Sequence, residues 1–243
     1  LGHYARLKAE GRLEKYVPEN TPKISEAFRN FDPDGYYHPT SAGLVVLTYN
    51  TAKVKPEDAP KKWEDLLDIK WKGKVSTGHP GFSGYVGTWV LSMKKLYGWQ
   101  YFDKLEKNKP QIGRSINDTV TALNAGERQV AAGADGSTLF SAARGNPLAV
   151  SYPSDGSVLI IAPSAIMKGT KHPNAAKLFM EYLYTIEASK INAKHFGIPL
   201  RPEVPSPPGA KPISEIKVIR PTVAEVEKGL PEVIEQWRDT FGN

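Results

Sequence analysis

Two apolar runs, far apart in the sequence, constrain the fold more than any other feature. Residues 44–50 (LVVLTYN) and 158–167 (VLIIAPSAIM) each have the length and the content of β-branched residues that are typical of a buried strand. Between them, shorter strand patterns alternate with helix patterns, which favours an α/β protein. A middle segment bracketed by two such strands can close on itself as one lobe, so the two ends of the chain are left to form a second lobe.

The middle segment is predicted to hold short elements that alternate in type. Strands are expected at residues 73–77, 110–115, 128–133 and 148–153, and helices at residues 63–68, 98–108, 118–126 and 137–145. A further helix follows Ser83, and its apolar face is made of Val86, Trp89, Val90, Met93 and Leu96. This order of elements predicts a sheet whose strands are separated by helices.

The last third of the chain is predicted to contain two more helices. Residues 172–197 have the pattern of one long amphipathic helix that ends at a glycine, and residues 231–243 form the second. The apolar side of the long helix is expected to be Ala176, Phe179, Leu183 and Ile186. The proline-rich run at residues 199–212 is interpreted as an extended connector, because no independent core follows it.

The composition argues against several classes of function. The chain has 243 residues, of which 40% are apolar and 24% charged, as in ordinary soluble proteins. Its formal net charge is +6, but the lysines alternate with acidic residues, so we expect a solvated surface and no nucleic-acid partner. The absence of cysteine excludes disulfides, thiolate metal sites and a cysteine nucleophile in this stretch.

Four stretches, in this order and separation, carry a resemblance to a known family. They are residues 7–18 (LKAEGRLEKYVP), 44–54 (LVVLTYNTAKV), 59–75 (APKKWEDLLDIKWKGKV) and 155–189, which contains HPNAAKLFMEYL. Together they resemble the bacterial extracellular solute-binding proteins of ABC importers, with the type II fold shared by ferric-ion, thiamine, polyamine and phosphonate binders. The resemblance implies a periplasmic protein that closes two α/β lobes on a small solute and presents it to a membrane permease.

The resemblance also implies how the lobes divide the chain. The first lobe is expected to contain residues 1–43 and 166–216, and the second residues 44–165 and 217–243. Members of the family begin with a secretion signal and then a strand, a helix and a strand, which are not found before Leu1. We therefore expect an incomplete first lobe with uncovered sheet edges, which could dimerise or swap strands.

The loop before the helix at Ser83 is the first candidate for a ligand contact. Free N–H groups and the positive end of the helix dipole favour an anion at Ser83, Gly84 and Tyr85. A simple capping role for Ser83 explains the sequence equally well. Asn117 stands at a second helix start, where capping is again the alternative to a ligand contact. The resemblance implies that both helix starts face the ligand.

The window AAGADGSTLFSAARG offers three further candidates. Iron-binding relatives carry adjacent tyrosines here, and the resemblance places Ser137 and Thr138 at those positions. Neutral hydroxyls can hydrogen-bond an organic solute but cannot replace phenolate ligands, so direct ferric-ion binding is disfavoured. Asp135 could accept a hydrogen bond from an ammonium or hydroxyl group, although a turn aspartate before Gly136 is an equal alternative.

Three more residues lie next to the two long strands. Tyr37 and His38 precede the first strand and could line the cleft with aromatic surface, or could belong to an ordinary surface turn. Asp155 begins the return to the second long strand, where it could reach the cleft or simply form a turn. The three residues are therefore included among the ligand-binding candidates.

Signals for enzyme chemistry are poor. The five histidines show no paired metal spacing, and no GxSxG or phosphate-loop pattern occurs. We therefore expect no catalytic residue, no metal site and no cofactor. The predicted function is capture of a small polar, anionic or zwitterionic organic solute for an ABC importer. One alternative is ferric-ion binding through an exogenous anion, and another is an enzyme on the same fold.

Overall fold

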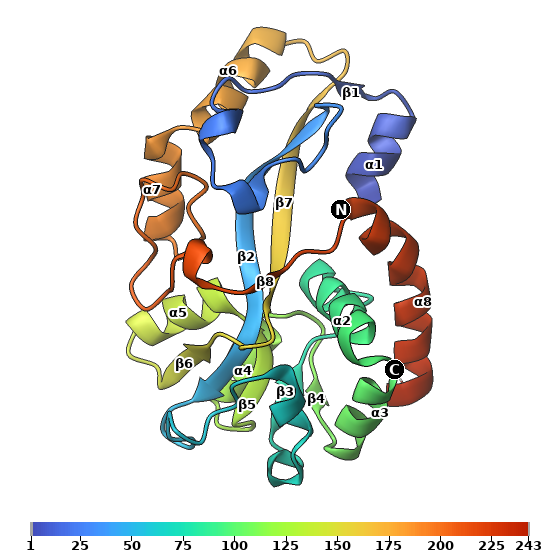
Figure 1. The fold of residues 1–243 in the computed structure, drawn as a ribbon, viewed down its shortest axis with the longest axis vertical. Helices are drawn as coiled ribbons and strands as arrows, with labels where there is room; N and C mark the ends of the chain where they lie inside the picture. Colours follow the sequence, from blue (N-terminus) through green and yellow to red (C-terminus); the bar gives the residue numbers. More distant parts are fainter. Residues whose placement is uncertain (1, 243) are drawn as a thin grey trace. The chain divides into compact units, whose positions relative to one another are not determined.

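The computed structural model describes residues 2–242, which pack into two compact units (Figure 1). The first unit is formed by Leu1–Gly43, Ile161–Ser214 and Thr222–Glu227, and the second by Leu44–Ile160, Glu215–Pro221 and Lys228–Asn243. The strands β2 (Tyr37–Asn50) and β7 (Ser157–Met167) each contain a unit boundary. Both strong strand runs of the sequence are thus confirmed as strands.

The second unit is built on a mixed sheet. Strand β3 (Val75–Thr77) lies parallel to β4 (Gln111–Ile112) on one side and to β5 (Val130–Ala134) on the other. Strand β2 is antiparallel to β5 and to β6 (Leu148–Ser151), whereas β8 (Val218–Ile219) pairs in parallel with the start of β7. Each of the three parallel strands is followed by a helix, because α2 (Gly84–Tyr97), α4 (Asp118–Asn124) and α5 (Asp135–Ala143) come after β3, β4 and β5 in turn.

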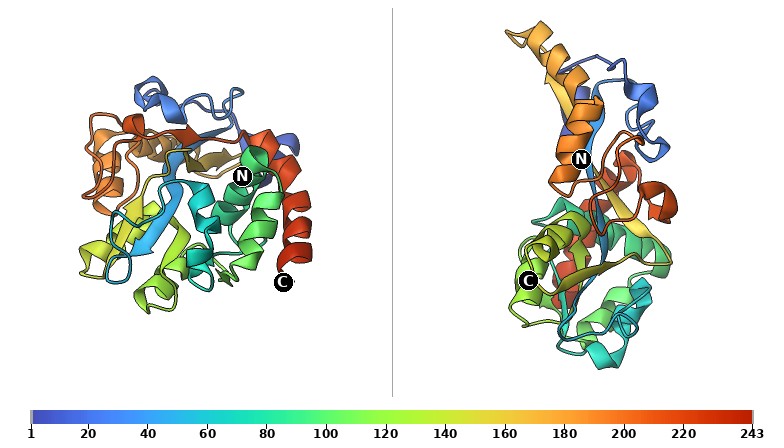
Figure 2. Two further views of the ribbon diagram at one scale, coloured as in Figure 1. Left: turned by 60° about the horizontal axis from the view of Figure 1, so that its bottom comes forward. Right: turned by 90° about the vertical axis from the view of Figure 1, so that its left-hand side faces the viewer.

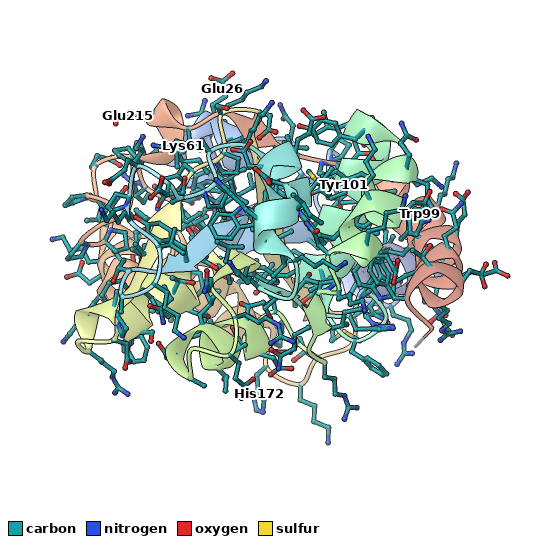
Figure 3. The ribbon with its side chains drawn as sticks, turned by 90° about the horizontal axis from the view of Figure 1, so that it is seen from below. Glu26, Lys61, Trp99, Tyr101, His172 and Glu215 are labelled. Atoms are coloured by element: carbon teal, nitrogen blue, oxygen red, sulfur yellow. The ribbon has the colours of Figure 1, made fainter. Side chains whose placement is uncertain are left out.

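The main core of the second unit lies under α2, α3 (Gln100–Lys107) and α8 (Val223–Phe241). Trp63, Trp89 and Trp237 are fully buried there. Trp99 lies beside α8 (Figure 3), and its indole N–H donates to the Thr240 hydroxyl at 2.9 Å. These contacts fix the C-terminal part of α8 against the helices that follow β3.

The predicted apolar face of α2 is confirmed except at its end. Val86, Trp89, Val90 and Met93 are fully buried, whereas Leu96 is 46% exposed. The core ends before the last turn of this helix, where Tyr97 packs against it instead. Two other predicted helices differ in type or length. The helix expected at residues 63–68 is the 3₁₀ helix Trp63–Leu67. The helix expected at residues 231–243 is the end of α8, which begins at Val223 and contains Pro231.

The first unit contains α1 (Gly2–Ala9), and β1 (Leu13–Glu14) pairs antiparallel with the end of β7. Figure 2 shows that the long helix expected over residues 172–197 is two helices, α6 (Pro173–Leu183) and α7 (Ile186–Lys194). The prediction of one continuous helix is wrong because Thr185 caps a new helix, its hydroxyl accepting from the Ala188 N–H at 3.1 Å.

The break between α6 and α7 also changes which side chains are buried. Phe179 is 59% exposed and Ile186 36% exposed, although both were expected on the apolar side. Met180 and Tyr184 are buried in their place, and the Tyr184 hydroxyl donates to the Pro39 carbonyl oxygen at 2.7 Å. Within residues 2–242, no helix combines the length and the hydropathy that crossing a membrane would require.

Candidate functional site

Three helices of the second unit begin at the same edge of its sheet. Neighbouring parallel strands point their carboxyl ends in one direction, so the loops that follow β3, β4 and β5 meet there. The loops are in close contact, because a Cβ atom added to Gly78 would lie 2.9 Å from the carbonyl oxygen of Ser115. The starts of α2, α4 and α5 form the candidate site, which we call the helix-start cluster.

A direct hydrogen bond joins the starts of α4 and α5. The Ser137 hydroxyl donates to the side-chain oxygen of Asn117 at 2.8 Å. Asn117 occupies the capping position of α4, but among the described residues its side chain makes no capping bond. Asp118 ties down the preceding loop instead, because its carboxylate accepts from the Ser115 N–H at 2.8 Å. The capping role considered for Asn117 is therefore not observed. Its side chain instead links the start of α4 to the start of α5.

The start of α2 leaves its backbone open. Ser83 precedes the helix with extended backbone angles, and within residues 2–242 its hydroxyl makes no capping bond. Apart from its chain neighbours and the backbone of its own helix, a Cβ atom added to Gly84 would have no described atom within 4 Å. The first N–H groups of α2 can thus be approached closely by a ligand.

Tyr85 and Asp135 are electrostatically coupled across the helix-start cluster. Burial and the Asp135 charge together raise the pKa of Tyr85 to about 12. Burial also raises the pKa of Asp135 to about 6, against the opposing effect of the Leu44 and Gly136 N–H groups. Tyr85 is therefore a neutral phenol near pH 7.

Asp135 and Thr138 point into the protein. Asp135 is only 4% exposed, and its carboxylate accepts from the Leu44 N–H at 2.9 Å. It is the first residue of α5 and not a turn residue ahead of the helix. Thr138 is fully buried, and its hydroxyl donates to the Ala134 carbonyl oxygen at 2.7 Å. Ser137 and Thr138 are the two residues that the sequence resemblance places where iron binders carry tyrosines, and only Ser137 is partly exposed.

Arg114 and Phe82 belong to the helix-start cluster, and the sequence reasoning missed both. The guanidinium carbon of Arg114 lies 4.9 Å from the centroid of the exposed Phe82 ring, a distance typical of a cation–π contact. Arg114 was assigned to a strand over residues 110–115, but β4 ends at Ile112. Gly113 could have indicated in the sequence that the strand ends before Arg114. In the structure a Cβ atom at this position would lie 2.4 Å from the Asp118 side chain, so the tight approach needs a glycine.

Asp155 is not brought together with the helix-start cluster. Its carboxylate accepts from the Trp63 N–H at 2.9 Å and from the Tyr97 hydroxyl. Tyr97 is the last residue of α2, a helix of 14 residues. A helix of that length spans about 20 Å, so Asp155 lies at the opposite end of α2 from Ser83.

Tyr37 and His38 lie in the first unit, where both are almost completely buried. The Tyr37 ring packs against Tyr4 and Phe31, with centroids 5.7 and 5.8 Å apart. A ring nitrogen of His38 lies 2.7 Å from the Tyr16 carbonyl oxygen. Both side chains therefore contribute to packing inside their own unit.

The family model described as bacterial extracellular solute-binding protein matches residues 3–219. The chain belongs to this family. A protein of Salmonella typhimurium named "Putative 2-aminoethylphosphonate-binding periplasmic protein" is 25% identical over 211 residues, which cover 82% of this chain and 60% of the relative. An uncharacterised protein of Haemophilus influenzae is 26% identical over 74% of this chain and 55% of its own length.

Solved structures show the fold independently. The periplasmic binding protein AfuA from Actinobacillus pleuropneumoniae, with exogenous fructose-6-phosphate bound, has a TM-score of 0.83 at 23% identity over all of this chain and 80% of its own. Iron-bound HitA from Pseudomonas aeruginosa has a TM-score of 0.80 at 23% identity, over 97% of this chain and 78% of its own. The predicted type II periplasmic-binding-protein fold is confirmed. The chain spans somewhat more than half the length of these two curated relatives.

Proposed function

We propose that this protein is the solute-binding component of an ABC import system, and that the helix-start cluster binds the anionic group of a small organic solute. The observation that carries the proposal is the convergence of helix starts, the Ser137–Asn117 bond and the Arg114 guanidinium at one edge of the sheet. N–H groups at helix starts, hydroxyls and a guanidinium all donate hydrogen bonds, and an anion accepts them.

A phosphate or phosphonate group fits this donor set well. It offers several acceptor oxygens, whereas α2 and α5 supply backbone N–H groups and Ser83 supplies a hydroxyl. Ser137 would turn its single O–H from Asn117 to the anion. The Salmonella relative is named for 2-aminoethylphosphonate, and AfuA has fructose-6-phosphate bound. Both compounds carry such a group, which supports the proposal. An ammonium group of a zwitterion has a weaker case here, since the Asp135 carboxylate is buried and already accepts backbone hydrogen bonds.

The chemistry at the helix-start cluster favours binding over catalysis. The Ser137 hydroxyl donates to an amide oxygen of Asn117, which cannot accept a proton as a general base would. We therefore assign solute capture and not an enzymatic reaction. The two packing units would act as the lobes expected from the sequence, moving about β2 and β7, and the solute-loaded form would be presented to permease subunits at the periplasmic side of the membrane.

The test is calorimetric titration with 2-aminoethylphosphonate, fructose-6-phosphate and inorganic phosphate, using ethanolamine and fructose as matched ligands without the anionic group. We expect binding of at least one phosphoryl ligand, and no binding of ethanolamine or fructose, because both lack the anionic group. Ser137→Ala should weaken that binding, whereas Ser151→Ala should not, because the Ser151 hydroxyl donates to the Pro60 carbonyl oxygen elsewhere in the same unit. Equal affinities for both variants and the parent protein would contradict the assignment of the site.

A further inference from the structure

The first unit contains a cavity of about 650 Å³ that the proposed function does not use. It lies between the 3₁₀ segment Glu26–Phe28 and the chain that follows α7, up to Ser214. Its volume falls within the range of about 300 to 1,000 Å³ that small-molecule sites occupy. The two walls are tied together, because the Ser25 N–H donates to the Leu200 carbonyl oxygen at 2.8 Å.

A buried guanidinium forms one wall of this cavity. Arg201 is 6% exposed, and its Nε and Nη2 donate to the Glu203 carboxylate at 3.2 and 2.7 Å, while Nη1 donates to the Tyr184 carbonyl oxygen at 3.2 Å. A guanidinium carries five N–H donors, so among residues 2–242 these three bonds leave two donors for another acceptor. Glu203 itself is half exposed, which leaves its carboxylate accessible to exchange with a second carboxylate.

The remaining lining sets the character of a ligand. Arg29 is a second guanidinium, and Glu26 is the one carboxylate among the described lining residues. Hydroxyls come from Ser25, Ser206 and Ser214. The rest of the wall is mostly apolar and stiff, because several prolines fix its backbone. In the free protein Glu26 and Glu203 balance the charges of the two arginines, so an acid would bind by taking the place of Glu203 at Arg201. Two guanidinium groups would then face one carboxylate, which favours an acid, and the apolar wall favours a hydrocarbon body.

We propose that this cavity is a second binding site, for a small organic acid with an apolar body. The carboxylate would bind at Arg201 and Arg29, and the body would pack against Ile198 and Val204. The site lies wholly in the first unit, so it does not depend on the helix-start cluster of the second unit.

Benzoate is a suitable probe, with benzamide as the neutral ligand of the same shape. We expect saturable benzoate binding in heteronuclear NMR titrations, and binding of benzamide about tenfold weaker, since a charge-assisted hydrogen bond is lost. Arg29→Gln should weaken benzoate about tenfold by the same reasoning, whereas Arg12→Gln, which removes an exposed guanidinium of the same unit, should leave it unchanged.

Arg201 is buried, so replacing it could disturb folding. The cavity is therefore tested by placing a larger side chain at Ile213, a less buried lining residue. Ile213→Trp should abolish benzoate binding while the NMR spectrum stays dispersed. Benzoate binding that survives Ile213→Trp, or that matches benzamide, would overturn the proposal. So would a loss of benzoate binding in Ser137→Ala, because it would place benzoate in the helix-start cluster.

Discussion

The Asp135 carboxylate accepts a hydrogen bond from the Leu44 N–H at 2.9 Å, at the residue where β2 enters the second unit. Asp135 opens α5, and two residues further on Ser137 bonds to Asn117 at the start of α4. The first turn of α5 is therefore joined to β2 on one side and to α4 on the other. This turn holds the helix-start cluster in place.

Asp135 should make the stability of the protein depend on pH. Burial raises its pKa from 3.8 to about 6, so between these values the folded protein binds more protons than the unfolded chain. The contribution of Asp135 to the free energy of unfolding should then fall as pH rises from about 4 to about 6, by on the order of 3 kcal/mol, and stay constant above that. Urea unfolding at a series of pH values measures this slope.

Asp135→Asn should remove this part of the slope, because an amide does not titrate. Asp103→Asn, on an exposed position of α3, is the matched control and should keep it. A variant Asp135→Asn with the same pH slope as the parent protein would show that another group is responsible.

The bond between Ser137 and Asn117 can be measured by a double-mutant cycle. Ser137→Ala and Asn117→Ala each remove one partner of a 2.8 Å hydrogen bond, so their effects on the free energy of unfolding should not add. We expect each single variant to cost about 0.5 to 1.5 kcal/mol, and the double variant to cost no more than about one of them. Strict additivity in urea unfolding would mean that the two side chains do not interact in solution.

The sequence predicted the fold better than the site, for physical reasons. Strands such as β2 and helices such as α2 have strong apolar periodicity, which reports burial directly. The direction of a polar side chain has no such signal, so Thr138, buried against the Ala134 carbonyl, could not be told from the partly exposed Ser137. Asp155 is a ligand-binding candidate in the sequence because it begins the return to the second long strand. Chain order does not show that it lies at the Tyr97 end of the 14-residue helix α2, away from Ser83.

Adding a side chain at Gly84 or at Gly87, both in α2, should affect ligand binding in the first case and stability in the second. Gly84 has open space where a Cβ atom would lie, whereas at Gly87 it would be 2.6 Å from the Leu230 side chain and 3.2 Å from the Pro80 carbonyl oxygen. Gly84→Val should therefore fold with nearly unchanged stability but bind a phosphoryl ligand more weakly, because the branched side chain blocks approach to the helix start. Gly87→Val should lower the melting temperature by overpacking the core.

Calorimetry and thermal unfolding on the same preparations separate these two effects. If Gly84→Val kept full affinity for the ligand that the parent protein binds, the backbone at the start of α2 would not take part in binding. If Gly87→Val melted like the parent protein, the packing of α2 against α8 would be looser than the distances indicate.

The last prediction concerns iron, because it distinguishes an organic anion from a ferric ion as the ligand of the helix-start cluster. The sequence resemblance implies that a ferric ion would be held by phenolate ligands, and these give a visible charge-transfer band. Tyr85 is the one tyrosine that the described residues place in the cluster, and its pKa of about 12 makes the phenolate costly to form. Ser137 offers only a neutral hydroxyl. The protein should therefore stay colourless when ferric citrate is added. A visible band that disappears in Tyr85→Phe but persists in Tyr97→Phe, at the other end of α2, would show that iron binding overcomes this cost and that a metal is the cargo.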